Sequence, residues 1–223
     1  MKNLAVLFSG GKDSSYACWL AKKNGYQIKC LISVISKNKE SYMFHTPSIE
    51  QVRKQAEVMN IPLLVIETKG EKEKELVDLE KAIKIAVKRY EIGGIVTGAV
   101  GSVYQSSRIQ KICNKLKIEC FNPLWQKNQL DILKELIKNK FEVVIVGVFA
   151  YPLDKKWLGR KIDNNFIKDI NELNRKYKIN LAGEGGEYES FVINCYLFSR
   201  ELKIINHKDY GNKNSWRREL ELK

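Results

Sequence analysis

The sequence contains few residues of the kinds that mark disulfide-rich or metal-binding proteins. Its cysteines number five, and no two of them have Cys-x-x-Cys spacing, which argues against a disulfide framework and a zinc site. The two histidines, His45 and His207, are too few and too far apart for a histidine-rich metal site. We therefore expect reduced, buried thiols. The cysteines are Cys18, Cys30, Cys113, Cys120 and Cys195.

Long hydrophobic runs are also absent. The longest, residues 143–151, is interrupted by Gly147 and is much shorter than the ~20 residues that cross a bilayer. At the amino terminus, Met1-Lys2-Asn3 leads directly into the short apolar run 4–8, without the pattern of a signal peptide. We therefore expect a cytoplasmic protein with no membrane partner.

The charge balance is strongly basic, with a formal net charge of +13. Such a charge is compatible with nucleic-acid binding, with an acidic protein partner, or with lysines spread over solvated helix faces. Lysine and glutamate alternate closely in residues 69–80, and no RNA-binding signature is present. We favour the solvated faces and expect no stable nucleic-acid binding.

The first two thirds of the chain alternate between strand and helix patterns, which predicts βαβ units around a Rossmann-like parallel sheet. The pattern changes after about residue 151, so we expect a nucleotide-binding domain at 1–150 and a small α+β domain at 151–223. Strands are expected at 4–8, 28–35, 63–66, 95–97, 118–121 and 142–149. Helices are expected at 12–24, 48–60, 76–90, 102–116, 130–139 and 163–177.

A glycine-containing loop follows the first predicted strand and opens the first predicted helix. Glycines permit close backbone approach to a ligand, and the free N–H groups of a helix N-terminus favour phosphate. The loop is neither a Walker A loop nor a dinucleotide fingerprint; a simple tight turn is the structural alternative. The residues expected to bind the nucleotide are Ser9, Gly10, Gly11, Lys12, Asp13 and Ser14. Asp13 is also a candidate ligand for Mg2+.

A second glycine loop begins at Gly98, after the predicted strand 95–97. In open parallel sheets, ligands bind at the carboxyl ends of the strands, so both loops are expected at one site. Gln105 and Arg108 follow on one face of the next helix, where Arg108 either holds a phosphate or carboxylate or forms a surface salt bridge. His45 either contacts the nucleotide or substrate or packs before Pro47.

The sequence Ser-Gly-Gly-Lys-Asp-Ser resembles the PP-loop of the ATP-pyrophosphatases, which implies a sheet like that of the adenine nucleotide alpha hydrolases and cleavage of ATP between the α and β phosphates. Four further segments, 42–47, 98–108, 123–125 and 183–190, make residues 3–193 resemble the diphthine–ammonia ligase branch. The resemblance implies that an acid on elongation factor 2 becomes an acyl adenylate and is then amidated. No glutaminase signature is present, so ammonium is the expected nitrogen donor.

The acidic segment 183–190 is the feature that selects this branch. Its carboxylates are suited to bind an ammonium ion, to take its proton, or to face the trimethylammonium of diphthine; a solvated or Mg2+-associated loop is the alternative. The implied catalytic residues are Lys12, Asp13, Glu184, Glu187 and Glu189. The implied substrate-binding residues are His45, Tyr104, Gln105, Arg108, Gly185, Gly186, Tyr188 and Ser190, where Tyr188 either encloses a cation or is a core aromatic.

Three other functions are compatible with parts of this pattern. They are amidation of a small carboxylic acid by the same chemistry, tRNA modification, and nucleotide sensing without catalysis. The acidic segment favours diphthine over a small acid, and no catalytic cysteine or added RNA-binding domain is evident for tRNA modification. The sequence leaves open whether the chain forms a homodimer.

Overall fold

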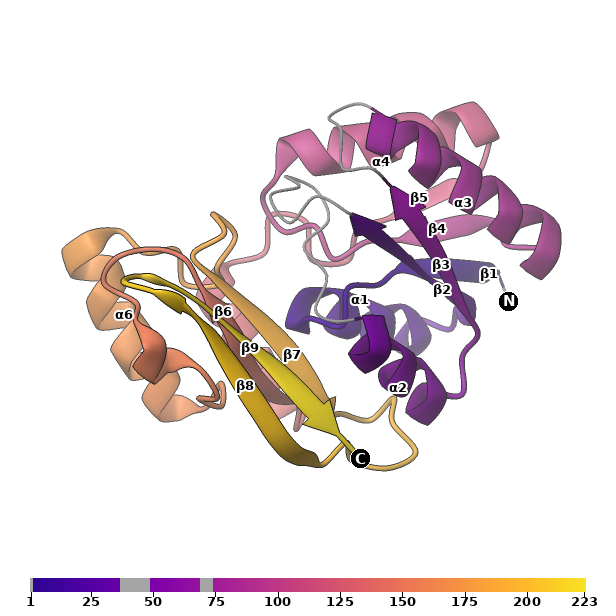
Figure 1. Cartoon of the computed structure of the whole chain (residues 1–223). Helices are drawn as coiled ribbons and strands as arrows, with labels where there is room; N and C mark the ends of the chain where they lie inside the picture. Colours follow the sequence, from indigo (N-terminus) through magenta and orange to yellow (C-terminus); the bar gives the residue numbers. More distant parts are fainter. Residues whose placement is uncertain (1, 37–48, 69–73) are drawn as a thin grey trace.

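The protein was analysed as a computed structural model, which describes residues 2–36, 49–68 and 74–223. Five parallel strands form the first sheet, in the order β3-β2-β1-β4-β5 (Figure 1). The strands are β1 (Asn3–Leu7), β2 (Gln27–Ser36), β3 (Leu63–Thr68), β4 (Gly94–Val96) and β5 (Glu119–Phe121). The strand order reverses between β1 and β4, which creates the switch point where ligands bind in such sheets.

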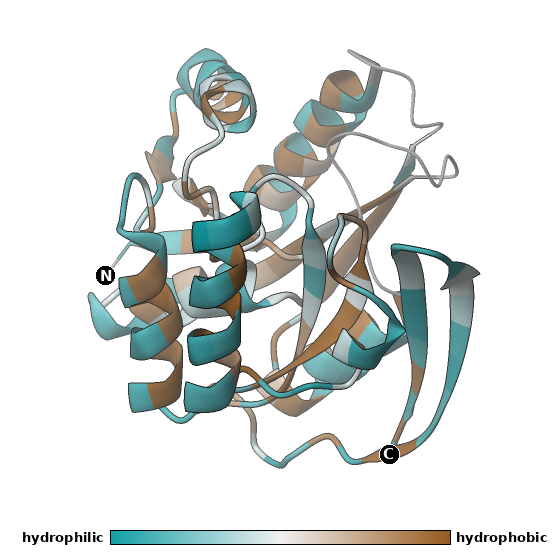
Figure 2. Cartoon of the chain, turned by 90° about the vertical axis from the view of Figure 1, so that its left-hand side faces the viewer, coloured by the Kyte–Doolittle hydropathy of each residue, from teal (hydrophilic) through white to brown (hydrophobic). Residues whose placement is uncertain are grey.

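Helices cover both faces of this sheet because alternate residues of β1 point to opposite sides. Leu4 and Val6 belong to the apolar cluster that contains side chains of α1, α2 and α5, whereas Ala5 belongs to the cluster of α3 and α4. Figure 2 shows the same helices with hydrophilic outer faces. The helices are α1 (Lys12–Lys23), α2 (Ile49–Met59), α3 (Lys74–Tyr90), α4 (Val103–Leu116) and α5 (Gln129–Lys138). The predicted Rossmann-like sheet is thus confirmed.

A second, antiparallel sheet has the strand order β7-β6-β9-β8. Helix α6 (Asn164–Tyr177) packs on one face through Phe166 and Ile170, and Val58 of α2 packs on the other. The sheet therefore lies between α6 and the first sheet's helices (Figure 1). Its strands are β6 (Glu142–Val148), β7 (Tyr188–Asn194), β8 (Ile204–Asn212) and β9 (Ser215–Leu222), and a short 3-10 helix, η1 (Lys155–Trp157), follows β6.

The prediction that residues 142–149 continue the parallel sheet is wrong. This strand is β6, and it pairs in antiparallel fashion with β7 and β9. Its apolar run was ambiguous because β6 is buried on both faces: Val143 and Ile145 contact one apolar cluster, whereas Val144 and Val146 contact another. A fully buried strand looks the same in either kind of sheet. The change of sheet therefore comes before β6 and not near residue 150.

The remaining structural expectations concern the thiols and the membrane. All five cysteines are free, and four of them are buried. Burial raises the pKa of Cys18 to about 12, so this thiol stays protonated at neutral pH. Among the described residues, no helix has the length and apolar composition needed to cross a membrane. Ser48, where the second predicted helix begins, lies outside the described residues.

Candidate active site

The two glycine loops meet at the carboxyl ends of β1 and β4. Gly98 packs directly on the first turn of α1, where an added Cβ atom would lie 2.7 Å from the Ser14 nitrogen and 2.8 Å from the Asp13 carbonyl carbon. Any other residue at this position would push the loops apart, because real Cβ atoms do not approach backbone so closely. The structure thus brings Gly98 against the predicted phosphate loop.

The phosphate loop is shaped by its own hydroxyl groups. The Ser9 N–H donates to the Ser14 hydroxyl oxygen at 3.3 Å, and the two hydroxyl oxygens are 3.2 Å apart. The Ser14 hydroxyl donates to the Gly11 carbonyl at 3.1 Å. Gly10 has a φ of +80°, in the left-handed region that favours glycine. The loop therefore turns sharply and presents the N-terminal N–H groups of α1 to a ligand.

Lys12 and Asp13 form an ion pair at the start of α1. The Lys12 ammonium is 2.7 Å from one Asp13 carboxylate oxygen, and the lysine side chain is only 4% exposed. The other Asp13 oxygen, Oδ1, is buried and accepts no hydrogen bond from the part of the chain that the structure describes. A buried acceptor without a donor is costly in a folded protein, which makes Oδ1 the atom of this loop most suited to a cationic ligand.

Strand β7 of the second sheet lies directly against the loop. The Lys12 N–H donates to the Ser190 hydroxyl at 3.2 Å, and the Val192 N–H donates to the Gly10 carbonyl at 3.1 Å. At Gly11, a Cβ atom would lie 3.2 Å from the Ser190 carbonyl oxygen. Ser190, predicted to bind substrate, therefore joins the two sheets at the loop.

Gln55 is a site residue that the sequence prediction missed. Its side chain is fully buried, and its amide nitrogen donates to the carbonyls of both Gly10, at 3.0 Å, and Val192, at 2.7 Å. The available signal was a polar side chain within the apolar stripe of α2, beside Val52 and Ala56. Such a residue needs a buried hydrogen-bond partner.

Of the three acidic side chains in 183–190, Glu184 lies nearest to the glycine loops. It accepts a hydrogen bond from the Gly101 N–H at 3.2 Å. Burial raises the pKa of Glu184 above its usual value, and the negative charge of Asp13 adds to this effect, whereas Lys12 opposes it. Glu184 therefore contacts the second glycine loop through Gly101 and lies within electrostatic range of Asp13 in the phosphate loop.

Glu187 stabilises the loop to which it belongs. Its two carboxylate oxygens accept the N–H groups of Asn180, at 3.0 Å, and Gly185, at 2.9 Å. Gly186 has a φ of +82°, as the turn requires. Asn180, which the sequence prediction also missed, accepts the Glu184 N–H at 3.1 Å. These contacts fix the segment that carries Glu184.

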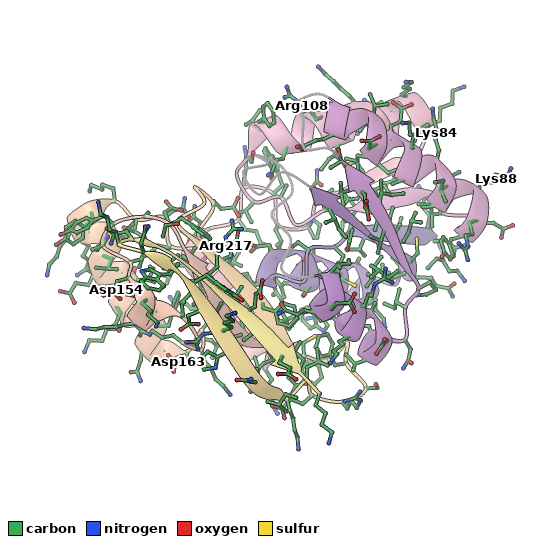
Figure 3. All side chains as sticks on the ribbon, in the orientation of Figure 1. Lys84, Lys88, Arg108, Asp154, Asp163 and Arg217 are labelled. Atoms are coloured by element: carbon green, nitrogen blue, oxygen red, sulfur yellow. The ribbon has the colours of Figure 1, made fainter. Side chains whose placement is uncertain are left out.

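Glu189 and Tyr188 point to opposite sides of β7. Glu189 lies beside Gly147, with its carboxylate 3.8 Å from the Arg217 guanidinium; Figure 3 shows Arg217 on β9 of the second sheet. Tyr188 is 5% exposed, donates to the Leu181 carbonyl at 2.7 Å, and has its ring 5.5 Å from the Lys12 ammonium. Tyr188 is thus a core aromatic whose ring faces a lysine of the protein itself.

The predicted residues of α4 lie one turn apart. The Arg108 guanidinium stacks over the Tyr104 ring, 3.5 Å from its centroid, and Figure 3 shows Arg108 on this helix. The Gln105 N–H donates to the Ser102 hydroxyl at 3.3 Å, which caps the helix. His45 lies outside the described residues, so its predicted contact with nucleotide or substrate stays a prediction.

We predict that Gln55→Ala weakens ATP binding. The substitution removes the donor shared by Gly10 and Val192, so unfolding free energy should fall by about 1–3 kcal/mol and the Kd for ATP should rise about tenfold. Urea unfolding and calorimetric titration measure the two effects. Gln51→Ala is the matched control, because Gln51 donates to the Leu220 carbonyl from the same helix at 2.7 Å. It should lose similar stability and keep its Kd; an unchanged Kd in Gln55→Ala would contradict the assignment.

The raised pKa of Glu184 gives a second prediction. The folded state holds this proton more tightly than the unfolded state, so ionisation at pH 7 lowers stability. Glu184→Gln should therefore unfold at higher urea than wild type at pH 7, and the difference should vanish below about pH 4, where the unfolded carboxyl is also protonated. Glu187→Gln should show the opposite sign at pH 7, because an amide cannot accept both backbone N–H groups. A less stable Glu184→Gln would refute the electrostatic argument.

Comparison with known proteins places nearly the whole chain in one family. Residues 1–120 match the sequence model of the diphthamide synthase N-terminal domain, and residues 128–219 match that of the C-terminal domain. The chain is similar to the diphthine–ammonia ligases of Bos taurus and Homo sapiens, each 34% identical over 90% of this chain and 82% of the relative. It is 27% identical to that of Schizosaccharomyces pombe over 90% of this chain, which corresponds to 36% of the longer relative.

Both halves of the described site fall within these matches. The phosphate loop and Gly98 lie in the part that matches the N-terminal domain, whereas Glu184 and Ser190 lie in the part that matches the C-terminal domain. The family assignment therefore covers the same two segments that the structure brings into contact. The chain belongs to the diphthamide synthase family.

Proposed function

We propose that the chain amidates diphthine on elongation factor 2, using ATP and ammonium and releasing AMP and pyrophosphate. The observation that carries the proposal is the position of Glu184, whose pKa is raised by burial and by the charge of Asp13 in the phosphate loop. A base for the nitrogen donor thus lies beside the group that binds the activating nucleotide. Relatives named diphthine–ammonia ligase favour this acceptor over a small acid or tRNA.

The phosphate loop binds ATP in this proposal. Its glycines leave room for phosphate oxygens, and the N-terminus of α1 supplies N–H donors and a favourable dipole. Lys12 neutralises charge that develops on the phosphates as pyrophosphate leaves. Gly98 and Ser190 keep the loop in the required shape through the contacts described above.

Asp13 is the residue best suited to Mg2+ among those that touch the loop. Its buried Oδ1 has no hydrogen-bond donor among the described residues, and a carboxylate oxygen is a ligand that Mg2+ prefers. Within residues 2–36, 49–68 and 74–223, no three His, Cys, Asp or Glu side chains gather as a metal site. This fits an ion held by one carboxylate together with the substrate phosphates. When bound, the ion would stabilise negative charge on those phosphates.

The reaction needs two steps because a carboxylate oxygen is a poor leaving group. An oxygen of the diphthine carboxylate attacks the α-phosphorus of ATP, and pyrophosphate leaves. Ammonia then attacks the acyl carbon, and AMP leaves with the oxygen that came from the carboxylate. Glu184 accepts the proton that ammonium must lose before it attacks; a raised pKa makes it a stronger base than an ordinary carboxylate.

The other acidic residues support this step in the proposal. Glu187 holds the loop that carries Glu184 through its bonds to Asn180 and Gly185. Glu189 lies on the other face of β7, next to Arg217. We assign Glu187 to positioning, whereas a catalytic role for Glu189 and substrate contacts of Tyr104 and Arg108 stay predictions.

The assay is direct. The protein is incubated with diphthine-bearing elongation factor 2, ATP, Mg2+ and ammonium, and the modified peptide is weighed. We expect a loss of about one mass unit, the change from acid to amide, together with AMP and pyrophosphate. Release of ADP and phosphate, or an unchanged peptide mass, would contradict the proposal.

The test variant for this assay is Asp13→Ala, and Asp154→Ala is its matched control. Asp13→Ala removes the carboxylate of the phosphate loop and should abolish AMP formation. Asp154 caps the short helix η1, where it accepts the Lys156 N–H at 2.9 Å, so its loss should leave AMP formation nearly unchanged. Full activity in Asp13→Ala would remove Asp13 from the mechanism.

A further inference from the structure

We propose that Tyr151 and Tyr177 form the docking surface for the protein acceptor, and that the polypeptide segment next to the reacting residue packs on these two rings. The inference rests on the proposed function, in which the carboxylate to be activated is carried by a protein. A side chain of a folded protein enters a site only if the segment that carries it lies on the surrounding surface. The residues around the acidic segment are therefore expected to include contacts for that segment.

The two tyrosines are exposed in a way that core packing does not explain. Tyr151 is 66% exposed and Tyr177 is 45% exposed. Their rings contact each other edge to face, with centroids 5.3 Å apart and an interplanar angle of 90°. Each ring thus holds the other in place while leaving much of its surface to solvent. Rigid, exposed aromatic pairs of this kind are typical anchors of protein interfaces.

Both tyrosines belong to stretches of chain that are bonded to Glu187 of the acidic segment. Tyr151 comes two residues after Phe149, whose N–H donates to the Glu187 carbonyl at 2.8 Å. Tyr177 comes three residues before Asn180, whose N–H donates to the Glu187 carboxylate at 3.0 Å. Both tyrosines thus lie within three residues of a group that is hydrogen-bonded to Glu187, the residue that fixes the loop of Glu184.

A third exposed apolar side chain comes from the stretch of chain that binds Glu184. Val103, at the start of α4, is 68% exposed. It comes two residues after Gly101, whose N–H binds the Glu184 carboxylate. Exposed apolar side chains therefore stand on stretches of chain that are bonded to Glu184 and to Glu187, which suits a polypeptide that crosses the acidic segment rather than a free small acid.

The charges near the tyrosines indicate the kind of segment that fits. Arg175 and Lys178 flank Tyr177 at the end of α6, and both are exposed. These cations, together with a net charge of +13, favour an acceptor segment that has apolar side chains for the rings and acidic residues beside them. Complementary charge at the rim of an interface raises the rate of encounter.

The test compares exposed tyrosines that differ in location. Tyr151→Ala and Tyr177→Ala should each raise the Kd and KM for diphthine-bearing elongation factor 2 about fivefold to tenfold, with kcat and the KM for ATP unchanged. Tyr196→Ala is the control, because Tyr196 is 64% exposed but follows the opposite end of β7. Tyr151→Phe, which keeps the ring, should retain most of the affinity. The KM for the acceptor should also rise with salt concentration.

The outcomes separate this inference from the proposed function. If wild type amidates the acceptor and the two alanine variants have unchanged Kd and KM, the docking surface is wrong and the function stands. If acceptor binding depends on the tyrosines but no amide forms, the docking surface stands and the function fails. Equal losses in Tyr196→Ala, or a matching rise in the KM for ATP, would overturn the docking surface, because either would mean a general disturbance.

Discussion

The carbonyl of Gly10 is the contact on which the rest of the site depends. It accepts the Val192 N–H from the second sheet and the Gln55 amide from α2, and Gln55 in turn donates to the Val192 carbonyl. A carbonyl oxygen has two lone pairs, and both have partners here. Three segments that are far apart in the sequence are thereby closed into one ring of hydrogen bonds. These bonds from β7 and α2 hold the phosphate loop in place, in addition to the hydroxyl contacts within the loop itself.

This ring fixes which acidic side chain lies beside the phosphate loop. Ser190 lies two residues before Val192 and receives the Lys12 N–H, so the start of β7 lies against the start of α1. The segment before β7 then brings the Glu184 carboxylate to the Gly101 N–H. Burial and the nearby negative charge of Asp13 both raise the pKa of Glu184. The same contacts keep two negative charges near each other in a partly buried site. That arrangement costs folding stability and suits a site that binds cations and takes up a proton.

Much of the first sheet could be predicted from the sequence, because its signals are local. Apolar strands alternate with helices, and the loop Ser9–Ser14 follows the first strand. The place of β6 could not be predicted, since Val143–Val148 is buried on both faces and such a strand fits a parallel or an antiparallel sheet. The hydrogen bonds of Gln55 to Gly10 and Val192, and that of Glu184 to Gly101, join residues that are far apart in the sequence, so the sequence could not predict them. The local sign of these contacts was Gln55 itself, a polar residue in the apolar stripe of α2.

The central claim is that this site activates a carboxylate at the α-phosphorus of ATP. The most direct measurement uses diphthine-bearing elongation factor 2 whose acceptor carboxylate is labelled with oxygen-18, followed by mass analysis of the nucleotide after one turnover with ammonium. Our account predicts AMP that carries one atom of the label, because the bond between the acyl carbon and that oxygen breaks when ammonia attacks. Unlabelled AMP, or label in inorganic phosphate, would contradict it.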